Sequence, residues 1–130
     1  MVKLASIDLG SNSTRLLIAE VDDQGLDVLI RMHIVTKMSE KIEQTGEISI
    51  EAFKRVNSAL RNFKKLLIEN DVDDVFVIGT AALRDAKNSD EIIENIKKNM
   101  TLKLKFYLVM MRELQQALEY CISWKIVKIF

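Results

Sequence analysis

The spacing of the hydrophobic residues changes near Ser49, and this change limits the folds that the chain can adopt. Before that point, over residues 26–34, apolar residues alternate with polar ones, and Leu29 is the exception. Alternation predicts a strand with one buried face, whereas steps of three and four residues predict an amphipathic helix. After Ser49 the apolar residues recur at the longer steps, at Phe53, Val56, Leu60, Phe63 and Leu67.

The segments on either side of this change predict a mixed α/β fold. Two short apolar runs at 4–9 and 16–19 flank a polar turn, so they and the strand at 26–34 form three meandering strands. Ser49 is the expected N-cap of the long helix, which ends near 69–71. A strand at 75–78 follows. A helix capped near Ser89, with Ile92, Ile96 and Met100 inward, and a strand at 102–106 complete a mixed sheet with helices packed on it.

Charge and cysteine content exclude several classes of protein. Lys plus Arg and Asp plus Glu each number 19, so no overall field draws the chain to nucleic acid or to an anionic membrane. Cys121 has no partner cysteine, which favours a reducing, cytoplasmic setting over a disulfide framework. No apolar stretch is long enough to cross a bilayer. We therefore expect a single cytoplasmic domain over residues 1–130.

The chemistry is concentrated in the polar turn after the first strand. Asp8 stands at the strand end and Gly10, Ser11, Asn12 and Ser13 follow. Glycine allows the backbone to approach an anion, while amide and hydroxyl groups supply uncharged donors. An ionised Asp8 needs an intermediary beside phosphate, such as Mg²⁺. A plain hairpin turn explains the same residues and stays open as an alternative.

Three segments resemble the Ppx/GppA family of the actin-like superfamily. Residues 5–18 are similar to the opening phosphate loop of the family. Residues 45–49, Thr-Gly-Glu-Ile-Ser, resemble the stretch that opens the long helix, and 79–88 resemble its Thr/Ser-Ala-x-Arg segment with the following Ala and Asn. The resemblance covers residues 3–105.

The resemblance implies the N-terminal lobe of a two-lobe phosphatase with an actin-like (ribonuclease H-like) fold. Members hydrolyse terminal phosphoanhydride bonds of polyphosphate or guanosine pentaphosphate with Mg²⁺. In that reading Asp8 is also a metal ligand. Arg84 could equally form a surface ion pair, Asn88 could cap a helix, and Arg15 could face solvent. The implied phosphate-binding residues are Asp8, Gly10, Ser11, Asn12, Ser13, Thr80, Arg84 and Asn88.

The resemblance ends near Lys105. Family members continue with an acidic motif whose carboxylate activates water, whereas this chain has the apolar run 106–111 before Arg112, and Glu113 is the nearest carboxylate. We hypothesise a frameshift near Lys105 that makes residues 106–130 partly foreign to the fold. No catalytic residue is assigned.

The chain also stops before the second phosphate loop and the second lobe of the family. We therefore expect a chain that is inactive alone. Two alternatives stay open: a non-catalytic module that binds phosphate or nucleotide or forms a homodimer, and a sugar or acetate kinase branch of the superfamily. His33 is expected to be exposed and receives no role.

Overall fold

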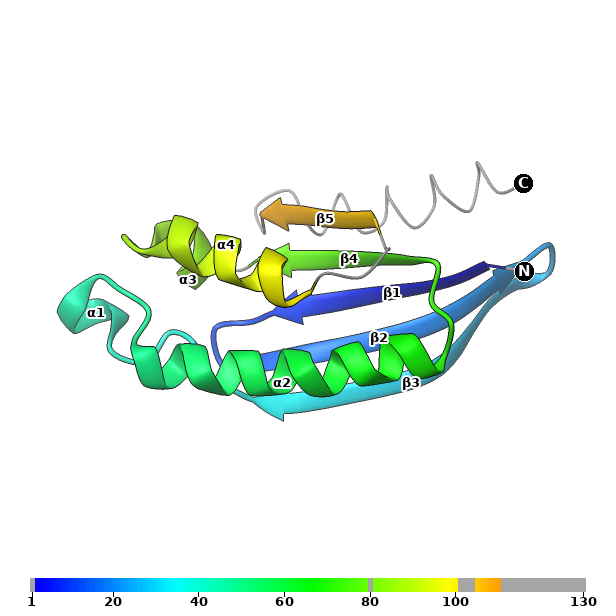
Figure 1. Ribbon diagram of the computed structural model, residues 1–130, viewed down its shortest axis with the longest axis horizontal. Helices are drawn as coiled ribbons and strands as arrows, with labels where there is room; N and C mark the ends of the chain where they lie inside the picture. Colours follow the sequence, from blue (N-terminus) through cyan, green and yellow to red (C-terminus); the bar gives the residue numbers. More distant parts are fainter. Residues whose placement is uncertain (1, 80, 101–104, 111–130) are drawn as a thin grey trace.

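The computed structural model describes residues 2–79, 81–100 and 105–110. Strands come first along the chain, and helices alternate with strands after them (Figure 1). The elements are β1 (Val2–Leu9), β2 (Ser13–Asp22), β3 (Gly25–Val35), α1 (Ile42–Thr45), α2 (Ile50–Glu69), β4 (Asp74–Gly79), α3 (Ala81–Asp85), α4 (Ser89–Asn99) and β5 (Lys105–Met110).

The strands form one mixed sheet in the order β3-β2-β1-β4-β5. β1 pairs with β2, and β2 with β3, in antiparallel fashion, as short hairpin connections allow. β1 pairs with β4, and β4 with β5, in parallel, because helices carry the chain back between them. The predicted fold class, three meandering strands followed by helix-linked strands, is confirmed.

A β-bulge explains why Leu29 interrupts the alternation of its strand. Ile18 pairs with Ile30, but the next residue, Ala19, pairs with Val28, so Leu29 is an extra residue on β3. An inserted residue shifts the side-chain alternation by one position. The exception in the sequence pattern is therefore a defined irregularity of the sheet.

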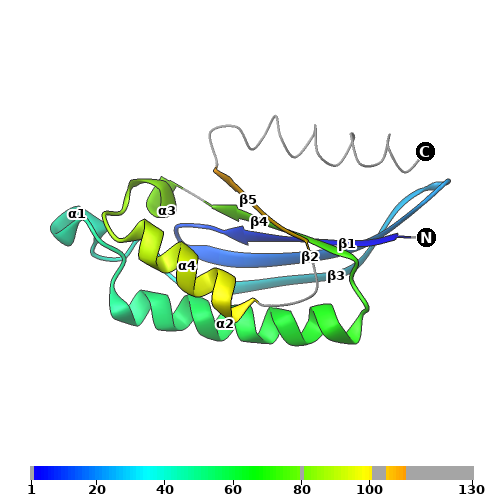
Figure 2. The same ribbon diagram turned by 45° about the horizontal axis from the view of Figure 1, so that its top comes forward.

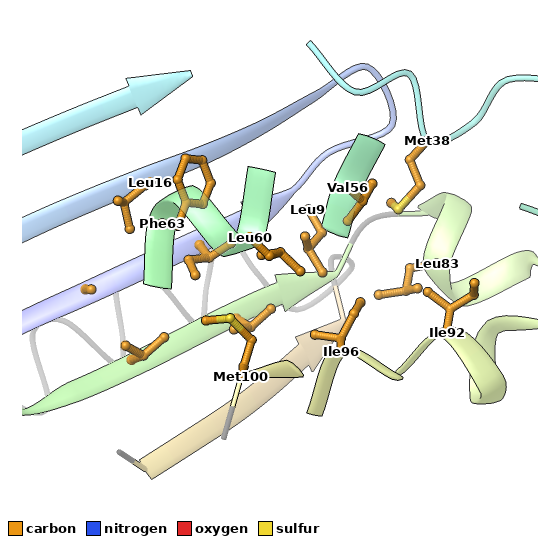
Figure 3. Close-up of a cluster of buried hydrophobic side chains, with 14 of the residues drawn as sticks. Leu9, Leu16, Met38, Val56, Leu60, Phe63, Leu83, Ile92, Ile96 and Met100 are labelled. Carbon is orange, nitrogen blue, oxygen red and sulfur yellow. The ribbon is translucent and has the colours of Figure 1, made fainter. Parts of the chain in front are cut away.

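Helices α2 and α4 pack against one face of the sheet, which we call the helix face (Figure 2). Ile7 and Leu9 of β1 and Phe63 of α2 are 0% exposed there. Figure 3 shows these layers meeting, with Ile96 of α4 on the side of Leu60 and Leu9, and Ile92 beside Leu83 of α3. Most of the expected inward residues are buried here, namely Val56, Leu60, Phe63, Leu67, Ile92, Ile96 and Met100. Phe53, in the first turn of α2, is only partly buried against the same cluster.

The two long helices begin differently. Ser49 is the N-cap of α2, as predicted, and its hydroxyl accepts a hydrogen bond from the Ala52 N–H at 3.1 Å. Asn88 holds the N-cap position of α4, one residue before Ser89, as the alternative for Asn88 proposed, but its side chain makes no capping hydrogen bond. Its side chain forms hydrogen bonds with the Ile48 backbone instead.

The short helices α1 and α3 were not predicted, because one helical turn gives no measurable period. Both lie at the end of the sheet where β1 and β4 finish (Figure 1). None of the helices in the described part of the chain is long and apolar enough to cross a membrane. The predicted strand at 102–106 overlaps β5, while residues 101–104, Cys121 and most of the expected divergent tail lie outside the described residues.

Candidate phosphate site

Residues 10–12 form the tight connection between β1 and β2, and Gly10 is required there for steric reasons. A Cβ atom on Gly10 would lie 2.4 Å from the Ser13 carbonyl oxygen. This distance is far below a van der Waals contact, and the clashing atom belongs to the backbone, which cannot swing aside. Only glycine therefore fits the loop as built.

The segment that follows β3 holds this loop by its carbonyl groups. The N–H groups of Thr36 and Lys37 donate to the Asn12 oxygen at 3.0 Å, and the Ser39 N–H donates to the Ser11 oxygen at 3.0 Å. In a trans peptide the C=O and the following N–H point in opposite directions. The N–H groups of Asn12 and Ser13 are thus directed away from this segment.

Arg55 of α2 fixes the same segment from the other side. Its Nε donates to the Thr36 carbonyl at 2.8 Å, and its guanidinium forms an ion pair with Glu40. The loop is consequently supported through the segment by a long, well-packed helix. Such indirect support holds a loop in one conformation before any ligand arrives.

Asp8 projects from the opposite side of the sheet to the helices, and we call this side the polar face. Its cross-strand neighbours are Arg15 on β2 and Ile78 on β4. The carboxylate oxygen Oδ1 is buried and has no hydrogen-bond partner in the described part of the protein. Burial raises the pKa of the Asp8 carboxyl above its usual value, and the Arg15 charge opposes the shift in part.

A cavity of about 460 Å³ opens on the polar face beside Asp8. Arg15 lies between Asp8 and His33 in the cross-strand register, so the three residues form one row across β1, β2 and β3. Arg31 lines the same cavity. Arg15 is exposed, as the alternative for it proposed, but it is exposed towards this cavity.

His33 contacts the loop itself, which sequence reasoning missed. Its Nε2 lies 2.7 Å from the hydroxyl oxygen of Ser13, although the two residues are 20 positions apart. His33 is exposed, as predicted. Its contact with Ser13 follows from the register of β2 against β3, which no local motif records.

A second cavity, of about 360 Å³, lies at the strand ends. It lies between the loop after β1 and the segment 79–88, two of the three segments that resemble the family. Ser11 of the loop faces it together with Asp85 of α3, and Ser39 and Lys41 close the remaining side. The loop after β1 and the helix after β4 are thus adjacent, as the parallel pairing of these two strands requires.

Asn88 connects the segment 45–49 to the segment 79–88 by hydrogen bonds. Its side-chain oxygen accepts the Ile48 N–H at 3.0 Å, and its side-chain nitrogen donates to the Ile48 carbonyl at 2.9 Å. Nearby, the Lys87 N–H donates to the Gly46 carbonyl at 2.9 Å. Asn88 therefore bridges two segments 40 residues apart; its predicted contact with phosphate stays a prediction.

The remaining predicted residues are placed in part. Arg84 makes an ion pair with the adjacent Asp85, with Nε 2.9 Å from Oδ1. This is the surface pair that the sequence left open, and a role for Arg84 in phosphate binding stays a prediction. Thr80 lies outside the described residues.

The residues present fit a Mg²⁺ ion held by a single carboxylate. The described residues contain no group of three or more His, Cys, Asp or Glu side chains that could enclose a metal ion. Asp8 does offer one buried oxygen without a partner. Mg²⁺ commonly binds through one or two carboxylates and keeps water and phosphate oxygens as its other ligands, and this single carboxylate matches that mode.

The mixed sheet and the helices packed on it define an actin-like α/β fold. The family model described as the Ppx/GppA phosphatase family matches residues 17–106, and the chain belongs to this family. A crystal structure of the Aquifex aeolicus Ppx/GppA phosphatase is similar, with a TM-score of 0.77 and 30% identity, covering 85% of this chain and 36% of that one.

Curated relatives agree with the family. Exopolyphosphatase 2 of Mycobacterium tuberculosis is 35% identical over 96 residues, which is 69% of this chain and 30% of that protein. A bifunctional 3-dehydroquinate synthase/phosphatase of Fusobacterium nucleatum is 29% identical over 107 residues, 77% of this chain and 16% of that protein. The chain thus spans less than a third of the length of either relative.

Proposed function

We propose that this chain is the N-terminal phosphate-binding lobe of an exopolyphosphatase or guanosine pentaphosphate phosphatase, located in the cytoplasm and inactive by itself. The observation that carries the proposal is the unpartnered Oδ1 of Asp8, two residues before the Gly10 loop. A buried carboxylate oxygen without a donor costs free energy, and a cation beside it removes that cost.

The loop would bind the phosphate and Asp8 would bind the metal ion. Ser11, Asn12 and Ser13 would donate hydrogen bonds to phosphate oxygens, and Asp8 would hold Mg²⁺. The ion, when bound, would neutralise phosphate charge that Asp8 would otherwise repel. Gly10 would let the backbone approach the anion. Thr80, Arg84 and Asn88 would lie beside the path of the remaining phosphates.

Titration calorimetry of the chain with tripolyphosphate, with and without Mg²⁺, tests the binding function. We expect Mg²⁺-dependent binding that Asp8→Ala abolishes. Asp23→Ala, in the exposed turn between β2 and β3, is the matched control and should bind normally. Equal binding by the two variants would contradict the proposal.

A phosphate-release assay with polyphosphate tests the predicted inactivity. We expect no turnover, because a cleft between two lobes is needed to exclude water and complete the site. Phosphate release that requires Mg²⁺ and disappears in Asp8→Ala would show that the lobe is active alone.

A non-catalytic, dimerising module is the second candidate. It is favoured by the large apolar side chains exposed on β3, since Leu26, Val28 and Leu29 are 41%, 39% and 42% exposed. Light scattering at several protein concentrations tests it. A concentration-independent monomer would leave the phosphate-binding lobe as the remaining proposal.

A further inference from the structure

The Ser13 hydroxyl is the loop group with the most restricted surroundings. Ser13 is only 8% exposed, and its oxygen lies 2.7 Å from Nε2 of His33. The imidazole of His33 is therefore a close partner of this hydroxyl, and an anion that reaches the loop would compete with it for the hydroxyl hydrogen.

The direction of the Ser13–His33 hydrogen bond decides what Ser13 can offer an anion. A serine hydroxyl has one hydrogen to donate and can accept at its oxygen. When Nε2 carries a hydrogen it donates to Ser13, and the hydroxyl hydrogen stays available. When Nε2 is unprotonated it accepts that hydrogen, and the anion loses a donor.

We propose that His33 is a positioning residue for the loop: with a proton on Nε2 it leaves the Ser13 hydroxyl free to donate to a phosphate oxygen. The inference rests on the proposed function and adds a pH-dependent element to it. Phosphoryl oxygens that carry negative charge act as acceptors, so each protein donor turned towards them strengthens binding.

The charges around His33 link its protonation to anion binding. Arg15 lies directly opposite His33 on β2, Arg31 lies two residues earlier on the same face of β3, and Asp8 lies beyond Arg15 on β1. Both arginines carry positive charge near the imidazole, and a bound anion offsets that charge. Binding of anion and proton therefore reinforce each other, and by linkage the effect is reciprocal.

The test is a double-mutant cycle on tripolyphosphate binding at constant Mg²⁺. Affinities are measured for the unsubstituted chain, His33→Gln, Ser13→Ala and the double variant, at about pH 5.5 and about pH 8, on either side of the usual histidine range. Glutamine retains an amide that can donate but does not change charge. Tripolyphosphate itself changes charge between the two pH values. The ratio of the affinities of the unsubstituted chain and His33→Gln at one pH cancels this effect.

We expect the affinity ratio of the unsubstituted chain to His33→Gln to rise about tenfold from the higher to the lower pH, as one charge-assisted hydrogen bond would give. In the Ser13→Ala background the ratio should stay constant. A constant ratio in both backgrounds, with normal binding, overturns the role of His33 but leaves the proposed function standing. If the unsubstituted chain binds no tripolyphosphate at either pH, both fail.

A second measurement needs no histidine variant and covers the case in which His33→Gln does not fold. Calorimetry in two buffers of different ionisation enthalpy gives the protons taken up per anion bound near neutral pH. The unsubstituted chain should take up more than Ser13→Ala. Equal uptake by the two proteins would show a merely structural contact between His33 and Ser13 and would overturn the proposal.

Discussion

The two faces of the sheet are built from the same strands but carry different residues. On the helix face, Ile7, Leu9, Leu16 and Ile18 are at most 2% exposed and belong to one hydrophobic cluster. On the polar face, the alternating positions of β1 and β2 include the cross-strand pair Asp8 and Arg15. Alternation along a strand thus lets one set of residues stabilise the fold while the other remains available for chemistry.

Stability and binding should therefore respond to different substitutions. Changes on the helix face should alter unfolding and leave tripolyphosphate affinity intact in the folded fraction. Changes at the loop and on the polar face should do more to binding than to stability. The following predictions test this division, beginning with the largest effect.

Phe63→Ala should destabilise the chain by about 3–5 kcal/mol, because it opens a cavity under α2 at a side chain that is 0% exposed. Urea unfolding followed by circular dichroism measures the change. Ile68→Ala, on the same helix but 57% exposed, is the control and should stay within about 0.5 kcal/mol. Similar losses in the two variants would mean that the helix face is not the main source of stability.

Gly10→Ala should cost about 2 kcal/mol and also weaken tripolyphosphate binding, because the new Cβ would force the Ser13 backbone to move. Gly25→Ala is the contrast: nothing lies within 4 Å of its Cβ, but its φ of +140° disfavours a side chain. That variant should lose about 1 kcal/mol and keep its affinity. Unchanged tripolyphosphate affinity in Gly10→Ala would show that the loop does not bind the anion.

Asn88→Ala should destabilise the chain by about 1.5 kcal/mol, since it removes both hydrogen bonds to the Ile48 backbone. Asn95→Ala removes an exposed bond within α4 and serves as the control. Asn88→Asp keeps the acceptor and loses the donor, so it should fall between them. If the loss in Asn88→Ala appeared only in tripolyphosphate affinity, Asn88 would belong to binding rather than to structure.

Asp8→Asn should have the smallest effect and the opposite sign, a gain of about 1 kcal/mol at neutral pH without Mg²⁺. The folded-state pKa of Asp8 is raised, so its protonated form is favoured by folding and the ionised form costs stability once pH exceeds that pKa. The gain should therefore shrink as pH falls towards 3.8, the ordinary pKa of an aspartate side chain. Urea unfolding across this pH range measures it.

Mg²⁺ provides the internal control for the Asp8 prediction. A cation that binds the folded chain stabilises it by mass action. Adding Mg²⁺ should raise the unfolding midpoint of the unsubstituted chain and leave Asp8→Asn unchanged. If Asp8→Asn were less stable than the unsubstituted chain at neutral pH, the Asp8 carboxylate would have a favourable partner after all.

The regular parts of the fold were predictable because they depend on local period. The alternation at 26–34 and the longer steps of α2 specified their elements, and Ser49 was recognised by its place before an apolar run. The predicted buried face of the strand at 26–34 is wrong at Leu26 and Val28, which are exposed and lie before the bulge at Leu29. The short helices α1 and α3 were missed because one turn carries no period. Leu29 was noticed as an exception, but only pairing with β2 shows it to be a bulge.

The candidate site was predictable only where its residues adjoin in sequence. Asp8 and residues 10–13 form a recognisable motif, whereas the Ser13–His33 contact depends on strand register. The bond from Asn88 to Ile48 depends on the approach of two segments 40 residues apart. Such contacts follow from tertiary packing, and no spacing within a single chain segment encodes them.

The place of β1 between an antiparallel and a parallel neighbour sets an order of events during synthesis on the ribosome. Its pairing with β2 needs only the next few residues, whereas its pairing with β4 must wait until Asp74–Gly79 have emerged. Until then one edge of β1 is open on the nascent chain. That open edge is a place where wrong strand pairing can occur while α2 is being made.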